Sequence, residues 1–160
     1  MATIKLQYGS SNQAITVTLT SLASAAARES TVVSNTTNLF LDALVSMKSK
    51  SATGTIGGDK AIYVYAYGSA DGGTTYPDNV TGSDAGITLV SPTQLRLIGV
   101  LNVPASNTAY DGGPWSVASA FGGVLPEKWG IVVQNVTGLA LSSTAGDHAL
   151  WYQGILGQTV

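Results

Sequence analysis

Short stretches in which apolar and polar residues alternate run through this chain, separated by turns rich in glycine, serine and threonine. In residues 15–20, for example, Ile15, Val17 and Leu19 occupy one set of alternating positions and three threonines occupy the other. A period of two residues is typical of a half-buried β-strand. We therefore expect eight or nine short strands, among them residues 15–20, 39–48, 61–67, 94–103 and 148–156.

Strands at this spacing, without helices between them, indicate an all-β fold, and we expect a jelly-roll-like antiparallel β-sandwich. The 160 residues are enough for one domain with its own core. We assign residues 1–160 to a single domain and set residues 1–14 apart as a candidate N-terminal arm. Residues 39–48 and 61–67 are expected to pair as a hairpin.

The alternation also predicts which side chains form the core. Val17, Leu41, Val64, Leu97 and Val133 each lie on the apolar face of an expected strand. We expect all five to be buried between the two sheets.

The charge pattern excludes several classes of function. Charged residues make up 10% of the chain and the net charge is −2, and the basic residues are scattered, which argues against nucleic-acid binding. The absence of cysteine rules out disulfides and thiolate chemistry. The apolar stretches are too short for a membrane span or a leader peptide, so we expect synthesis in the cytoplasm. A surface with so little charge favours self-association.

Few residues have the chemistry of a catalytic site. His148 is the single histidine, and its neighbour Asp147 lies next to it on an expected strand, where consecutive side chains point to opposite faces. Glu29 and Glu127, the two glutamates, are not spaced like a pair of catalytic carboxylates. We expect no catalytic residue, no metal and no cofactor.

Residues 68–86 form a long loop rich in glycine and aspartate. We expect it at an exposed end of the sandwich, in a role of interaction. Asp71 and Asp78 are expected to accept backbone N–H bonds in tight turns. Contact with a partner subunit is the second interpretation, and a bound calcium ion, favoured by the oxygen-rich composition, is the third.

Aromatic residues provide the other candidate contacts. Tyr63, Tyr65 and Tyr67 occupy alternate positions of one strand, on the face opposite its aliphatic residues. Such a row must be covered by a sheet or a loop, or it must contact a partner. Trp115 and Trp129 suit either a sugar-stacking platform or a subunit interface, where tryptophan is enriched.

A resemblance to a known group of proteins is found in residues 21–30, 33–38, 41–45, 64–76 and 125–138. These segments are similar to parts of small virion proteins of tailed bacteriophages. The resemblance covers most of the chain and brings no catalytic signature. It implies a jelly-roll-like subunit that decorates the head or belongs to the tail, and symmetric assembly, for which we expect a homotrimer.

The leading hypothesis is therefore a non-enzymatic phage virion protein, a capsid decoration (cement) subunit that contacts copies of itself and the major capsid protein. The alternative is a carbohydrate-binding module of the tail or a fibre, with Trp115 or Trp129 as its platform. A polysaccharide hydrolase ranks last.

Overall fold

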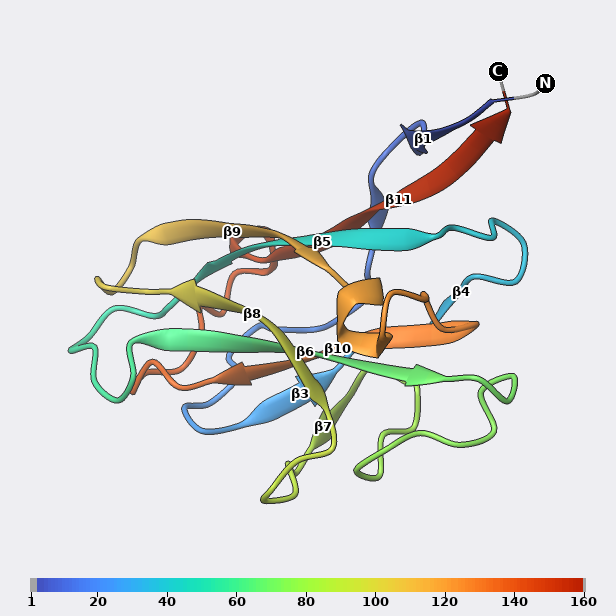
Figure 1. The fold of residues 1–160 in the computed structure, drawn as a ribbon. Coiled ribbons are helices and arrows are strands. Elements are labelled where there is room, and N and C mark those ends of the chain that lie inside the picture. The colour runs from blue at the N-terminus through green and yellow to red at the C-terminus, as the bar shows by residue number, and fades with distance from the viewer. Residues whose placement is uncertain (1–2, 160) are drawn as a thin grey trace.

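The computed structural model describes residues 3–159, which form two antiparallel β-sheets packed face to face (Figure 1). The chain is an all-β sandwich, as its alternating pattern predicted. Its only helical turns among residues 3–159 are the short 3₁₀ helices η1 (Ala118–Phe121) and η2 (Ala145–Asp147). None of the helices described is long and apolar enough to cross a membrane. The jelly-roll form of the sandwich stays a prediction.

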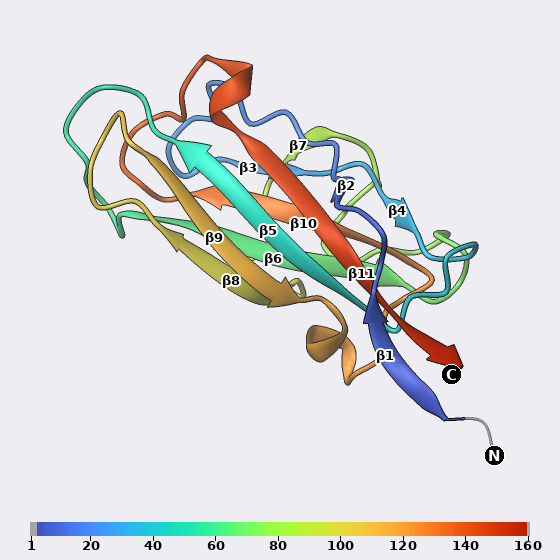
Figure 2. The same cartoon turned by 90° about the horizontal axis from the view of Figure 1, so that it is seen from above.

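One sheet, called sheet A, contains both ends of the described chain. Its strands follow the order β1–β11–β5–β9, and β2 also pairs with β11. In Figure 2 this sheet lies in front, with β9, β5 and β11 running across the molecule. The strands are β1 (Ile4–Tyr8), β2 (Gln13–Ala14), β5 (Asp42–Lys50), β9 (Ala109–Ser116) and β11 (Ala149–Thr159).

The second sheet, sheet B, has the order β7–β3–β10–β6–β8, and β4 pairs with β10. Its central strand β10 has three consecutive valine or isoleucine residues and is buried along most of its length, as expected for a strand covered on both faces. The strands are β3 (Ala27–Glu29), β4 (Val33–Ser34), β6 (Ala61–Ser69), β7 (Ala85–Ile87), β8 (Arg96–Asn102) and β10 (Lys128–Asn135).

The main core fills the space between the sheets. In β5 the alternation is complete, with Ala43, Val45 and Met47 fully buried between half-buried residues. Trp129 is 1% exposed and packs edge-on against Tyr152, their ring centroids 5.0 Å apart. Aromatic contacts of this geometry stabilise a core beyond the area that they bury.

The predicted core residues divide into three groups. Val64 and Val133 are fully buried, as predicted, and Val17 is half-buried. The predicted burial of Leu41 and Leu97 is wrong, because they are 51% and 54% exposed.

A β-bulge explains Leu97. In the pairing of β6 with β8, Val64 lies opposite Gly99 and Tyr65 lies opposite Leu97, so Ile98 is the extra residue. An extra residue shifts the alternation by one position and moves later side chains to the other face. Leu97 therefore faces outward beside Tyr65, although its sequence position matches that of the buried Leu101.

Leu41 has a different explanation. It directly precedes β5 at the end of the sandwich, where its N–H donates to the carbonyl of Ile155 at 2.7 Å. Its side chain lines a surface groove at this end of the molecule.

Two further expectations are corrected. Residues 15–20 form no strand, because they cross from β2 in sheet A to β3 in sheet B; Ile15 and Leu19 are still buried, at 4% and 2% exposure. The expected hairpin between residues 39–48 and 61–67 is also wrong. β5 and β6 lie in different sheets, and the segment between them crosses the sandwich.

Candidate functional site

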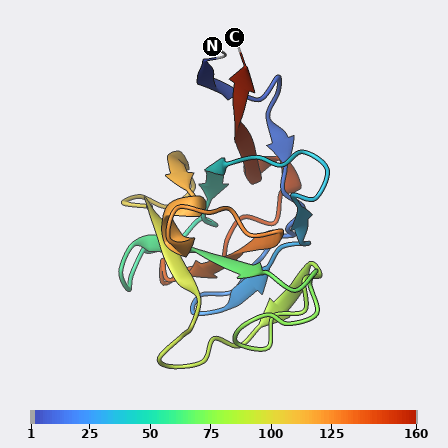
Figure 3. The ribbon, with the colours of Figure 1, turned by 45° about the vertical axis from the view of Figure 1, so that its right-hand side comes forward.

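The strand β1 and the end of β11 form a two-stranded ribbon that extends away from the sandwich, with both described termini at its far end (Figures 1 and 3). Ile4 pairs with Thr159, and Tyr8 pairs with Ile155. On the other side of β11, the pairing with β5 ends at Ile155. Of the candidate arm, residues 1–2 lie outside the described residues, and β1 and β2 both pair with β11.

One face of this ribbon is apolar. Directly paired residues share a face, so Ile4, Leu6, Tyr8 and Ile155 lie together. Ile4, Leu6 and Tyr8 are 74%, 73% and 61% exposed. Large apolar side chains grouped in this way on a surface mark a site of protein contact.

The ribbon joins the sandwich at a groove of about 500 Å³, whose lining includes Leu6, Tyr8, Leu41, Leu44 and Ala118. Asp42 also lies in its wall. The Asp42 carboxylate accepts bonds from the Ser116 hydroxyl at 2.6 Å and from the Ala118 N–H at 2.8 Å. Because these donors already occupy the carboxylate, most of the groove wall offered to a partner is apolar.

A second hollow of about 260 Å³ lies beside this groove and shares Tyr8 and Leu44 with it. The remaining lining residues combine an indole with amide and hydroxyl groups: Asn12, Ser46, Pro114, Trp151 and Gln153. We call the apolar face of the ribbon together with these two hollows the ribbon surface, and define it by Ile4, Leu6, Tyr8, Leu41, Leu44 and Trp151.

Sequence reasoning did not identify the ribbon surface. The alternation of Ile4, Leu6 and Tyr8 with Lys5 and Gln7 is readable in the sequence. It predicts a strand with one apolar face, but not whether that face is covered.

The predicted tyrosine row is partly covered by a loop. Tyr67 is fully buried, and its hydroxyl donates to the Ser30 carbonyl at 2.8 Å. The ring packs edge-on against Tyr76 of the 68–86 loop, with centroids 5.4 Å apart. Burial raises the pKa of Tyr67 far above its ordinary value. Tyr67 is therefore not available as a surface contact.

The other two tyrosines are half-buried. The Tyr65 hydroxyl donates to the Gln134 side chain at 3.3 Å, and burial raises its pKa. The Tyr63 hydroxyl donates to Asp59 at 2.8 Å, and this bond is the main reason that its pKa is raised. Contact of Tyr63 or Tyr65 with a partner stays a prediction.

The 68–86 loop, whose two ends belong to β6 and β7, covers part of the outer face of sheet B, and its own aspartates hold it by accepting hydrogen bonds. Asp71 accepts the N–H groups of Thr74 and Thr75, both at 3.1 Å, and the hydroxyl of Ser69. The Ser69 bond is the largest of several that lower the Asp71 pKa to about 2. The predicted role of Asp71 as an acceptor of backbone bonds is confirmed.

Asp78 accepts a backbone N–H as predicted, but not within a tight turn. Its carboxylate accepts the N–H of Gln94, 16 residues further along the chain, at 2.8 Å, and the hydroxyl of Thr93. Within residues 3–159, no group of three or more histidine or acidic side chains is arranged to hold a metal ion.

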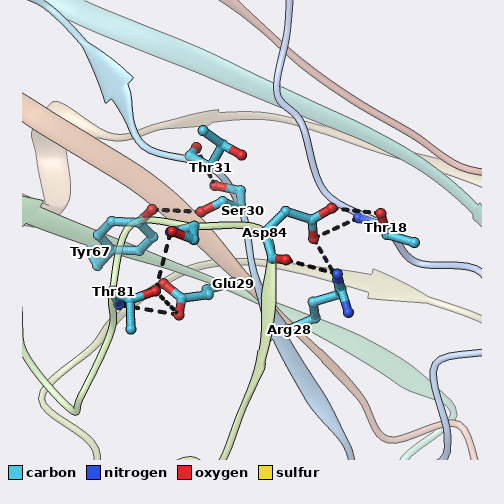
Figure 4. Close-up of polar contacts among 9 residues, drawn as sticks. Thr18, Arg28, Glu29, Ser30, Thr31, Tyr67, Thr81 and Asp84 are labelled. Carbon is cyan, nitrogen blue, oxygen red and sulfur yellow. Dashed lines mark hydrogen bonds and ion pairs between the residues drawn. The ribbon is translucent and has the colours of Figure 1, made fainter.

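Two further carboxylates tie the loop to β3 (Figure 4). Glu29, 1% exposed, accepts the N–H and hydroxyl of Thr81, each at 2.9 Å, and the N–H of Gly82 at 2.9 Å. Asp84 pairs with Arg28 at 2.5 Å and accepts the Thr18 hydroxyl at 2.6 Å. Burial alone would raise the pKa of Asp84, but the bonds from Arg28 and Thr18 outweigh it and lower the pKa.

The predicted tryptophan platforms are largely unavailable. The prediction of a platform at Trp129 is wrong, because this side chain lies in the core and is 1% exposed. Trp115 is half-buried and packs on Gly99 and Gly112, where any Cβ would come within 3 Å of the indole ring. Glycine is therefore needed at both positions for the indole to lie flat on the strands.

The single histidine has a local role. His148 Nδ1 contacts the buried Ser49 hydroxyl at 3.0 Å, and Nε2 contacts the Ser142 carbonyl at 2.9 Å. Asp147 instead accepts the Ser142 hydroxyl at 2.6 Å and pairs with Lys50 at 3.4 Å. Both imidazole nitrogens are occupied, and Asp147 does not orient the ring in the manner of a catalytic dyad.

Comparison with models of protein families, with curated proteins and with solved structures found no match. Any function of this chain must therefore be argued from its own residues.

Proposed function

We propose that this chain is a non-enzymatic structural subunit of a bacteriophage virion, a capsid decoration (cement) protein of jelly-roll type. It is made in the host cytoplasm and then assembles on the head through contacts with copies of itself and with the major capsid protein. A homotrimer is the assembly favoured by the resemblance to small phage virion proteins.

The ribbon surface is the observation that carries this proposal. It places Ile4, Leu6 and Tyr8, each more than 60% exposed, on a projecting ribbon next to an apolar groove. Removing such side chains from water favours association by about 25 cal/mol for each Å² of apolar area buried.

The rigidity of the rest of the molecule supports a structural role. The long loop is tied down by Asp71, Asp78, Glu29 and Asp84 through hydrogen bonds within the chain. A rigid subunit loses less conformational entropy when it binds, which suits a clamp between neighbouring proteins.

Immunogold labelling of virions from the encoding phage tests the proposal. Antibody against this protein should label the surface of intact heads, and added protein should bind virions that lack it. Binding should fall when Leu6→Glu, in which a charge replaces an exposed leucine of the ribbon surface, is added instead. Label confined to tails, or virions without the protein, would contradict the proposal.

The second hollow favours one alternative, a carbohydrate-binding module of the tail or a fibre. Trp151 and Tyr8 provide aromatic faces there, and Asn12 and Gln153 provide amides. Aromatic stacking combined with a few polar groups is typical of small-ligand sites.

A glycan array tests this alternative. Binding by the wild type that is lost in Trp151→Ala and kept in Trp115→Ala, the matched half-buried tryptophan of sheet A, would support it. Absence of binding to all glycans on the array would count against it.

A further inference from the structure

The outer edge of β1 differs from the other sheet edges of this molecule. In residues 3–159 the strand orders of the two sheets end at β1, β9, β7 and β8, and the two-residue strands β2 and β4 pair only with β11 and β10. Exposed edges are normally protected from pairing with other chains by proline, bulges, charge or short length. Three of these four edges have proline, a bulge or short length, whereas β1 has only the charge of Lys5.

The protected edges each use a different device. β9 contains Pro114, which has no N–H to donate. β7 is only three residues long, and β8 has the bulge at Ile98 and a charge at Arg96. β1 has five residues, no proline and no bulge, and Lys5 is its single charge.

Two hydrogen bonds establish which way the backbone of β1 faces. The Gly9 N–H donates to the carbonyl of Gly154, directly opposite it in the register, at 2.7 Å. The carbonyl of Ile155 instead accepts the Leu41 N–H, away from β1. Since pairs in an antiparallel ladder alternate between bonded and non-bonded, the pair of Tyr8 with Ile155 is non-bonded.

Continuing this alternation along β1 assigns the remaining residues. Lys5 and Gln7 bond to β11, whereas Ile4, Leu6 and Tyr8 direct their N–H and C=O groups to the open edge. The same three residues have their side chains on the apolar face of the ribbon. The edge therefore offers a set of backbone donors and acceptors beside exposed apolar side chains.

We propose that β1 pairs with β1 of a second copy of this chain, antiparallel and with a two-fold axis at Leu6. Leu6 then lies opposite Leu6 of the second copy, and Ile4 lies opposite Tyr8. All three outward-facing residues form bonded pairs, and their apolar side chains meet on one face. Sheet A continues from one subunit into the next.

Charge also favours a second copy in this register. Lys5 lies opposite Gln7, so no like charges face each other. An axis centred one residue earlier would place Lys5 opposite Lys5 of the second copy, which is unfavourable. The inference rests on the proposed function in one respect, namely that the ribbon is a site of contact with another protein. It adds the identity of the partner and a two-fold contact, and it proposes a homodimer in place of the homotrimer that the resemblance favours.

Light scattering on the purified full chain measures the mass of the particle in solution and so tests whether the protein is a dimer. The wild type at micromolar concentration should have twice the 16.3 kDa mass of one chain. Leu6→Glu and Leu6→Lys should each be monomeric, because the axis places like charges against each other. An equimolar mixture of these two variants should regain the double mass, since opposite charges then meet at the axis. Leu97→Lys, which changes an exposed leucine of β8, should remain dimeric.

Amide hydrogen exchange tests the register independently. In the wild type, all five β1 amides should be protected. In Leu6→Glu, the amides of Ile4 and Tyr8 should exchange at least tenfold faster, while those of Lys5 and Gln7, bonded to β11, should stay protected. A single cooperative melting transition of the variant would show that it folds, even if the melting temperature falls because the dimer is lost.

Three outcomes would overturn the inference: a monomeric or trimeric wild type, Leu6 variants as dimeric as the wild type, or no gain of mass in the mixture. Virion labelling distinguishes its failure from that of the proposed function. If the protein is monomeric but antibody labels virion heads, the dimer is refuted and the decoration role stands. If the protein is dimeric but absent from virions, the decoration role is refuted and the dimer stands.

Discussion

At the scale of single residues, burial separates positions that look alike in the sequence. Leu97 and Leu101 both lie in one apolar strand, yet the first is 54% exposed and the second 3%. Trp115 and Trp129 likewise differ, with only Trp129 fully inside the core. The contribution of each residue to the free energy of unfolding depends on these differences in burial.

We predict that Trp129→Ala lowers the free energy of unfolding by about 3–5 kcal/mol, because it leaves a large cavity in the core. Leu97→Ala should cost less than about 1 kcal/mol, as for an exposed side chain away from packing contacts. Urea unfolding of the two variants measures both values. Equal losses would mean that Leu97 is buried after all and that the bulge is misplaced.

Asp71 should make stability depend on pH in the acid range. Its pKa is about 2 in the folded protein, against an ordinary value of 3.8. A carboxyl with a lowered folded pKa stabilises the protein above its unfolded pKa, and this contribution is lost as the pH falls through the folded value. The free energy of unfolding should therefore decrease between about pH 4 and pH 2.

Asp71→Asn removes the titrating group, so we expect this variant to show a shallower decrease over the same pH range and lower stability near neutral pH. Asp84 and Asp147 also have lowered pKa values and retain part of the slope. Urea titrations across the range provide the measurement. Identical slopes for the variant and the wild type would refute the role of Asp71.

At the scale of elements, the 68–86 loop is the clearest case of a segment held by carboxylates. Glu29 lies at the centre, because it is buried and accepts bonds from two consecutive backbone N–H groups, those of Thr81 and Gly82. The Gly82 carbonyl in turn accepts the Val32 N–H at 2.9 Å. The loop and β3 should therefore open together.

We predict that the backbone amide hydrogens of Thr81 and Gly82 exchange much faster in Glu29→Gln than in the wild type. The reason is that the glutamine side chain has one acceptor oxygen, whereas the glutamate carboxylate has two. The expected loss of stability is about 2–3 kcal/mol, as for hydrogen bonds to a charged group. Hydrogen exchange by mass spectrometry measures the opening. Glu127→Gln, at the exposed second glutamate, is the matched control and should behave like the wild type.

At the scale of the whole molecule, apolar burial and hydrogen bonds dominate over ion pairs. Among residues 3–159, the ion pairs are Arg28 with Asp84 and Lys50 with Asp147, and all four side chains are partly exposed. Partly exposed pairs of this kind add little to the stability of the fold, because water and salt screen them. The net charge of −2 produces little repulsion between copies.

The protein should therefore tolerate salt. Between low and molar sodium chloride, we expect the free energy of unfolding to change by less than about 1 kcal/mol, since salt screens only the exposed charges. The dimer mass should also persist, because the proposed contact is formed by backbone bonds and apolar side chains. Urea unfolding and light scattering across the salt series measure both. Dissociation by salt would point to a contact between charges instead.

The sequence by itself determined the all-β class, the core positions of the central strands and the turn-forming role of Asp71. These features are local, because a two-residue period or a turn-forming aspartate acts within a few neighbours. Val64 and Val133 are buried as predicted for that reason.

Only the tertiary structure decided which faces are covered. Strands far away in the chain determine three features: the burial of Tyr67 under a loop, the outward turn of Leu97 at the bulge and the exposure of Leu6 on the ribbon. β1 pairs with residues 155–159, at the opposite end of the sequence, and this pairing leaves its other edge free. The alternation of residues shows that a strand has an apolar face. That face is buried only if a second element packs against it. Pairing between segments far apart in the chain determines whether such an element is present.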